Sequence, residues 1–122
     1  PLYVGASPKV LLAYLPDGER QRMIEEIEFE TYTSSTIADR EALRRCLDAV
    51  HADGFAVSEE DYEIGEYAFG APVRDHTGAV VAALSVTVPK VRCDLERREQ
   101  LIPLVVAAAE QLSRSMGLAV SA

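Results

Sequence analysis

Ten residues, Ala79-Val-Val-Ala-Ala-Leu-Ser-Val-Thr-Val88, are almost all small, apolar or β-branched, which is typical of a β-strand. Because successive side chains of a strand point to opposite faces, Ser85 and Thr87 share one face. Both faces are nearly apolar, so we expect a strand that is covered on both sides. Buried hydroxyls need hydrogen-bond partners. A bound polar ligand is one candidate partner, and the alternatives are neighbouring backbone groups or water near the strand end.

This strand is expected to be the second strand of a hairpin. Residues 67–73 predict a second strand, and residues 74–78 have the composition of a hairpin loop whose glycine suits a left-handed position. A shorter strand is expected at residues 55–57, and an acidic connection over residues 59–66 joins it to the hairpin. The pattern therefore favours an antiparallel sheet.

Helical patterns surround the predicted strands. Ser7 and Pro8 suit the start of a short helix, with Ser7 as the N-cap. Thr36 stands three residues before Asp39, as in a capping box, so a later helix is expected to begin at Thr36. Pro103 lies inside the last pattern and predicts a kink. The helices are expected over residues 7–15, 17–29, 36–54 and 94–117, with residues 31–36 extended or looped.

These elements predict the α+β fold class, an antiparallel sheet with helices packed on it. The sequence contains no G-x-G-x-x-G motif, no Walker loop and no series of long parallel crossovers. A nucleotide-binding α/β fold is therefore disfavoured.

Charge and composition exclude further classes of function. The 122 residues carry 12 Lys and Arg against 20 Asp and Glu, a net charge of -8, so this chain is not expected to hold DNA by itself. No apolar run reaches the roughly 18 residues that span a bilayer, and no signal peptide is recognisable, so we expect a cytoplasmic chain without membrane contact. Its two cysteines fit a reducing compartment. Because the first residue is Pro1 rather than Met, we expect a piece of a longer protein.

The turn Gly5-Ala6-Ser7-Pro8 is a candidate anion site. Free backbone N–H groups and the positive end of a helix dipole would face an anion there, and small residues allow close approach. The alternative is an ordinary helix start with water on its donors.

No catalytic or metal site is expected. The acidic residues 59–66 do not match a calcium-binding loop and are expected to be solvated. His51 and His76 are expected at the surface, and Cys93 is expected to be an inert thiol. Because the sequence offers no set of nucleophile, base and orienting group, we expect neither an enzyme nor a cofactor.

Several segments, in order and over almost the whole chain, resemble the C-terminal effector-binding domain of the IclR family of bacterial transcriptional regulators. They are Pro1–Lys9, Leu11–Pro16, Thr36-Ile37, His51–Ala56, Glu59-Glu60, Gly65, Ala71–Asp75, Gly78, Ala82–Val86 and Ala108–Ser113 before Gly117.

The resemblance implies a GAF-like fold, with helices on an antiparallel sheet and a small-molecule pocket beneath a helical loop. It implies that residues 1–122 are an effector-binding domain whose first helix and strands lie upstream of Pro1. A winged helix-turn-helix domain outside this chain would contact DNA. Dimers or tetramers of the protein are also expected.

The resemblance further implies which residues bind a small carboxylate effector. The aligned positions are Ala6, Ser7, Ser58, Ala68, Ser85 and Thr87. Position 58 is often acidic in the family, and position 68 is cysteine in some members. The expected function is to sense a small organic acid, without chemistry, and so to control DNA binding by another domain. The alternatives are a small-molecule enzyme on a similar fold and an oligomerisation domain with a vestigial pocket.

Overall fold

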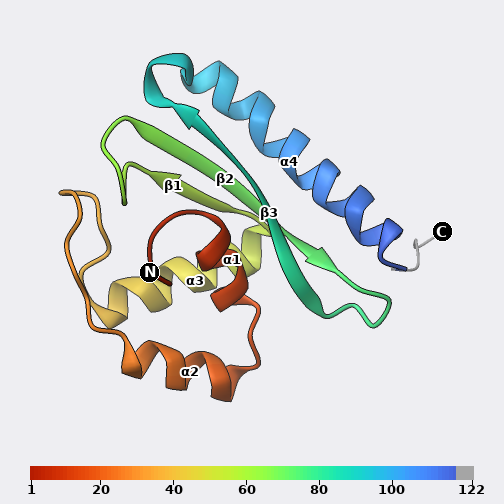
Figure 1. The fold of residues 1–122 in the computed structure, drawn as a ribbon, viewed down its shortest axis with the longest axis horizontal. Coiled ribbons are helices and arrows are strands. Elements are labelled where there is room, and N and C mark those ends of the chain that lie inside the picture. The colour runs from red at the N-terminus through yellow and green to blue at the C-terminus, as the bar shows by residue number, and fades with distance from the viewer. Residues whose placement is uncertain (118–122) are drawn as a thin grey trace.

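The computed structural model of the chain describes residues 1–117, and Figure 1 shows its arrangement. In chain order, the elements are α1 (Ser7–Ala13), α2 (Asp17–Glu26), α3 (Arg40–Asp53), β1 (Ala56–Glu59), β2 (Glu66–Arg74), β3 (Val80–Pro89), a single 3₁₀ turn (Lys90–Arg92) and α4 (Leu95–Ser115). Each predicted helix and strand is present, with ends that differ by a few residues. The α+β class is therefore confirmed.

The three strands form one antiparallel sheet in the order β1-β2-β3. A hairpin loop joins β2 to β3, and Gly78 in this loop has φ 87°, the left-handed conformation that its sequence predicts. β2 is the central strand, so its residues form the middle of both faces of the sheet.

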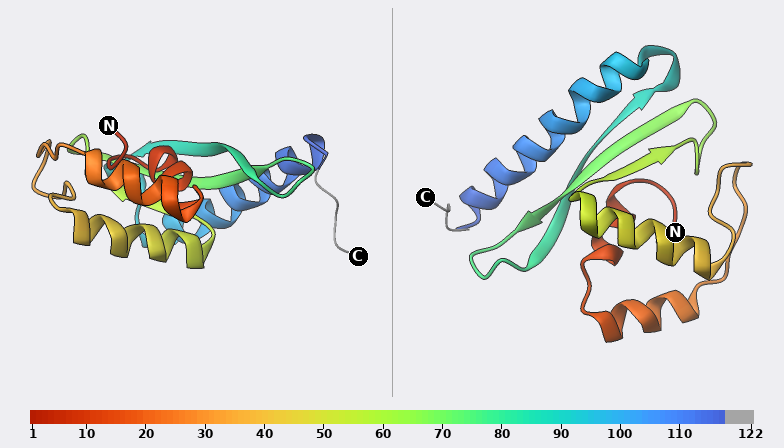
Figure 2. Two further views of the ribbon diagram at one scale, coloured as in Figure 1. Left: turned by 90° about the horizontal axis from the view of Figure 1, so that it is seen from below. Right: turned by 180° about the vertical axis from the view of Figure 1, so that it is seen from behind.

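Helices cover the two faces of the sheet separately. α4 lies along one side, and α1, α2 and α3 lie on the other, as the views of Figures 1 and 2 agree. We call these the α4 face and the α1 face. Odd-numbered residues of β2 meet every fourth residue of α4, because a strand alternates with period 2 and a helix repeats near 3.6. The α4 face buries Phe69, Ala71, Val73, Leu101, Val105 and Ala109, and the α1 face buries Val10, Leu12, Ile24, Leu43, Leu47 and Ala56.

The start of α1 rests directly on β2 at Gly70. A Cβ atom at Gly70 would lie 3.1 Å from the Cβ of Ala6 and 3.4 Å from its carbonyl carbon. A side chain at this position would therefore push the helix away from the sheet. Glycine allows the two backbones to approach closely.

Two predicted helix caps are wrong. The Asp39 side chain, not that of Thr36, caps α3 by accepting a hydrogen bond of 2.8 Å from the N–H of Ala42. Thr36 lies in the preceding loop, where its hydroxyl binds other backbone groups. Ser7 is already helical, and Ala6 occupies the N-cap position of α1 without a side-chain bond. Pro103 lies within α4, as expected, and the kink at this residue stays a prediction.

The expectation that both faces of β3 are covered is also wrong. Val86 and its even-numbered neighbours pack toward α4, but Ser85 and Thr87 are exposed. α1 has only seven residues. Ala83 of β3 packs against the core on the α1 face, but Ser85 and Thr87 lie outside this core. The end of β3 that carries Ser85 and Thr87 therefore faces solvent on the α1 side.

Within residues 1–117, no helix combines the length and apolar character needed to cross a membrane.

Candidate functional site

The strand register brings the predicted binding residues of the sheet onto one face. Ser58 of β1 pairs with Ala68 of β2, and Ala68 pairs with Thr87 of β3. These three residues form a row straight across the sheet on the α1 face. One step further along the strands, Ser85 pairs with Gly70. Because Ala6 packs on Gly70, the start of α1 stands beside this row.

The row changes from buried to open across the sheet. Ser58, at one end of the row, is buried, with 5% of the residue exposed. Ala68, in the middle, is half-buried, and Thr87, at the other end, is exposed. Within the described residues, the row is therefore open at its Thr87 end.

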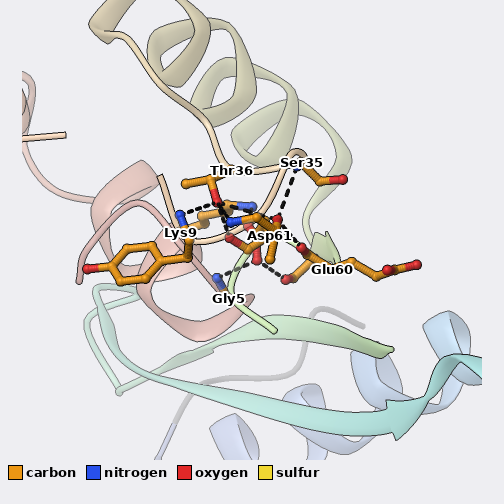
Figure 3. A network of polar contacts seen from close by, with 9 residues as sticks. Gly5, Lys9, Ser35, Thr36, Glu60 and Asp61 are labelled. Atoms are coloured by element: carbon orange, nitrogen blue, oxygen red, sulfur yellow. Dashed lines mark hydrogen bonds and ion pairs between the residues drawn. The ribbon is translucent and has the colours of Figure 1, made fainter. Parts of the chain in front are cut away.

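A buried ion pair closes the Ser58 end of the row. Lys9 of α1 and Asp61, which follows β1, are each 3% exposed, and the Lys9 ammonium contacts Asp61 Oδ2. The other carboxylate oxygen, Oδ1, accepts hydrogen bonds from the Gly5 N–H at 3.0 Å and from the Ser58 hydroxyl. Asp61 therefore joins the turn before α1, α1 itself and β1 in one polar network (Figure 3).

This network changes the interpretation of two sequence features. Asp61 was expected to be solvated with the rest of the acidic run, but it is buried because Lys9 balances its charge. The Gly5 N–H belongs to the turn that was a candidate anion site, but the Asp61 carboxylate of the protein itself already accepts a hydrogen bond from it. An anion at this turn would therefore need donors other than the Gly5 N–H.

The network also holds the loop before α3. The Thr36 hydroxyl donates to the carbonyl of Asp61 at 2.7 Å and accepts from the N–H of Thr33 at 2.9 Å. The Thr33 hydroxyl in turn donates to the carbonyl of Glu60. Figure 3 shows how Thr36 and Ser35 of this loop lie beside Asp61. The loop is therefore fixed to the same residues that close the site.

Cys46 of α3 lies close enough to the ion pair to feel its charges. Burial raises the pKa of the Cys46 thiol, the Lys9 ammonium opposes this shift, and the Asp61 carboxylate adds to it. A thiol with a raised pKa stays protonated near neutral pH and is a poor nucleophile. The site therefore gains no reactive cysteine from this residue.

The remaining chemical candidates lie away from the row. His51 and His76 are exposed, as predicted, and Cys93 is buried on the α4 face. In the part of the chain that the structure describes, no three His, Cys, Asp or Glu side chains are placed to hold a metal ion.

Lys9, Asp61 and Gly70 shape the site, and sequence reasoning missed them. Lys9 did leave a signal, because it is the charged residue in a seven-residue helix whose other members include Val10, Leu11, Leu12 and Ala13. A lysine within such an apolar segment is expected to have a buried partner.

Comparisons with known proteins agree on one family. The family model described as bacterial transcriptional regulator IclR C-terminal matches residues 1–114. The chain is 36% identical over 117 residues to the HTH-type transcriptional regulator KdgR of Escherichia coli, which covers 96% of this chain and 44% of KdgR. It spans less than half the length of the curated relatives that it matches.

Solved structures share the fold. A transcriptional regulator from Rhodococcus superposes with a TM-score of 0.91 at 33% identity, covering 95% of this chain and 48% of that one. The inducer-binding domain of PobR from Acinetobacter, a double mutant in complex with 3-hydroxybenzoic acid, gives a TM-score of 0.86 at 29% identity. That match covers 93% of this chain and 65% of the PobR chain.

Proposed function

The chain belongs to the IclR family of bacterial transcriptional regulators, whose C-terminal domain it matches, and we propose that it binds a small organic acid that controls transcription. The relatives are named as transcriptional regulators, not as enzymes. We assign DNA contact to a winged helix-turn-helix domain outside residues 1–122, because this chain has a net charge of -8. A regulator of bacterial DNA works in the cytoplasm, which is the location that we propose.

The observation that carries the proposal is the row of Ser58, Ala68 and Thr87 beside the start of α1. Two of its three side chains are hydroxyls, and Ser85 adds a third hydroxyl one step away. Such groups bind an oxygen-rich ligand without reacting with it. The half-buried methyl group of Ala68 forms the floor between them.

We place the effector carboxylate at the open end of the row. There, the hydroxyls of Ser85 and Thr87 donate to the carboxylate, and the backbone of Ala6 and Ser7 lies next to it. Hydrogen bonds to a charged group are stronger than neutral ones, at about 1.5–3 kcal/mol each. The complex of PobR with 3-hydroxybenzoic acid supports an organic acid as the ligand class.

The effector would act by binding one assembly state more tightly than another, which changes the spacing of the DNA-binding domains. Self-association is supported by an apolar stripe on the solvent side of α4. Its members recur every fourth residue and include Leu104, Leu112 and Met116, which are 60%, 42% and 48% exposed. An exposed stripe of this kind is typical of a surface between protein subunits.

Binding is tested by a thermal-shift screen of the full-length protein against small organic acids, followed by calorimetry of each hit. A ligand that binds only the folded state raises the melting temperature. Ser85→Ala should weaken binding of a hit by roughly ten-fold or more, because it removes one donor to the carboxylate. Equal affinity of folded wild type and Ser85→Ala would show that this strand does not line the site. Turnover of a bound acid would instead support the enzyme alternative.

A further inference from the structure

The Ser58 hydroxyl has already used its one hydrogen atom. A serine hydroxyl donates once and accepts through two lone pairs. Ser58 Oγ donates to Asp61 Oδ1, and an ion-paired carboxylate can only accept. Asp61 thereby fixes the hydroxyl in one orientation. Toward a ligand, Ser58 can therefore act only as an acceptor.

The cations around this end of the row are also occupied. Within the described residues, Lys9 pairs with Asp61, and Lys90 pairs with Glu60. A second negative charge on the ligand would meet Ser58 lone pairs and a carboxylate there, without an unpaired cation to balance it. The buried end of the row therefore selects against a dicarboxylate.

The row also sets the length of the ligand. Adjacent strands lie about 4.8 Å apart, so two spacings, about 9.6 Å, separate Ser58 from Thr87. Two O–H···O hydrogen bonds of about 2.7 Å each leave about 4 Å between the outermost ligand oxygens. This is the span of a chain of two or three carbons that carries an oxygen at each end.

From these three observations, we infer that the effector is a short hydroxylated monocarboxylate whose hydroxyl donates to Ser58. This inference rests on the proposed function, because it assumes that an organic acid binds the row. The carboxylate lies at Ser85 and Thr87, and the hydroxyl lies at the buried end. Asp61 acts as a positioning residue, since it orients Ser58 and does not touch the ligand.

Three acids of equal carbon number test the inference on the full-length wild-type protein. Calorimetry is performed with 3-hydroxypropanoate, propanoate and malonate at one pH and one ionic strength. The hydroxylated acid should bind about 3- to 10-fold more tightly than propanoate, which lacks the donor, and more tightly than malonate. Equal affinities of 3-hydroxypropanoate and propanoate, or a preference for malonate, would overturn the inference but leave the proposed function standing. Binding of none of the three acids, nor of any acid in the wider screen, would overturn the proposed function itself.

A substitution then locates the selectivity. Ser58→Ala should abolish the preference for 3-hydroxypropanoate over propanoate, since it removes the acceptor. The matched control is Ser115→Ala, because among residues 1–117 the Ser115 hydroxyl has its hydrogen bond with the carbonyl of Gln111 on α4, away from the row. The control should keep the wild-type preference. A folded Ser58→Ala protein that keeps the preference would contradict the assignment, and if this variant does not fold, the three-acid comparison on wild type decides.

Discussion

The Cβ of Ala6 stands 3.1 Å from the place where a Cβ of residue 70 would be, so Gly70 and Ala6 fit together only because one of them lacks a side chain. Few real Cβ atoms are this close to another atom. The contact ties the position of α1 to the strand that forms the floor of the site.

Gly70→Ala should displace the start of α1 and lower the free energy of unfolding by about 1–3 kcal/mol, as overpacking does. Urea unfolding measures the loss. Gly18→Ala is the matched control, because a Cβ at Gly18 in α2 meets nothing within 4 Å. This control should stabilise the protein by roughly 0.5–1 kcal/mol, since alanine favours a helix more than glycine does. Adding Ala6→Gly to Gly70→Ala should recover part of the lost stability. No recovery would mean that the contact with the Ala6 side chain does not cause the loss.

Lys9→Met should leave the buried Asp61 carboxylate without its counter-charge and destabilise the protein by about 3–5 kcal/mol. The double variant Lys9→Met/Asp61→Leu should be far more stable than the single one, because neither charge is then buried alone. Arg45→Met is the control, since its pair with Glu41 is exposed and should contribute less than about 1 kcal/mol. Denaturant unfolding of all three variants checks this, and similar losses for Lys9→Met and Arg45→Met would argue against a buried pair.

Asp39→Ala should cost about 1 kcal/mol of stability, because the N-cap bond to Ala42 is lost. Thr36→Val keeps the size of the side chain but removes the hydroxyl that holds the loop to Asp61. Amide hydrogen exchange distinguishes the two effects. Asp39→Ala should raise exchange in the first turn of α3, whereas Thr36→Val should raise it in residues 31–36. The reverse pattern would restore Thr36 as the helix cap.

Tyr32 should lose its proton at a higher pH than an ordinary tyrosine. Its hydrogen bond to Glu30 is the main cause that raises the pKa of Tyr32 from 10.0 to about 12. Because the folded pKa lies above the unfolded one, this interaction stabilises the protein fully below pH 10, and the contribution is lost as the pH rises toward 12. NMR titration of the Tyr32 ring should give a value near 12 in wild type and a value closer to 10 in Glu30→Gln. The same titration midpoint in both proteins would show that Glu30 is not responsible.

Leu104→Glu together with Leu112→Glu should weaken self-association of the full-length protein, since both side chains lie on the exposed stripe of α4. Sedimentation equilibrium should show a shift toward smaller species. Glu110→Gln on the same helix changes an exposed charged residue and serves as the control. If the double variant assembles as wild type does, another surface mediates assembly.

The sequence predicted the elements of this fold because their order depends on local periodicity. The alternation in β3 and the four-residue spacing in α4 are visible without any knowledge of packing. The ion pair of Lys9 and Asp61 was missed because the two residues are 52 positions apart, and charged residues are usually solvated. The choice between Thr36 and Asp39 as the helix cap depends on a tertiary partner of Thr36. The exposure of Ser85 depends on how far a short helix reaches across the sheet.

β2 gives alternate residues to two different tasks. Ala68 and Gly70 face the proposed effector. Their neighbours in the chain, Phe69 and Ala71, point to the other face and pack against α4. Because both sets of residues belong to one strand, a movement of that strand displaces the residues on both of its faces. If a ligand shifts the strand by a fraction of an ångström, α4 and its apolar stripe must follow or lose their packing, because a close-packed interior transmits strain. A shift of β2 at the proposed effector site would therefore reach the buried face of α4 directly, and the proposed assembly stripe on the opposite side of that helix would move with it.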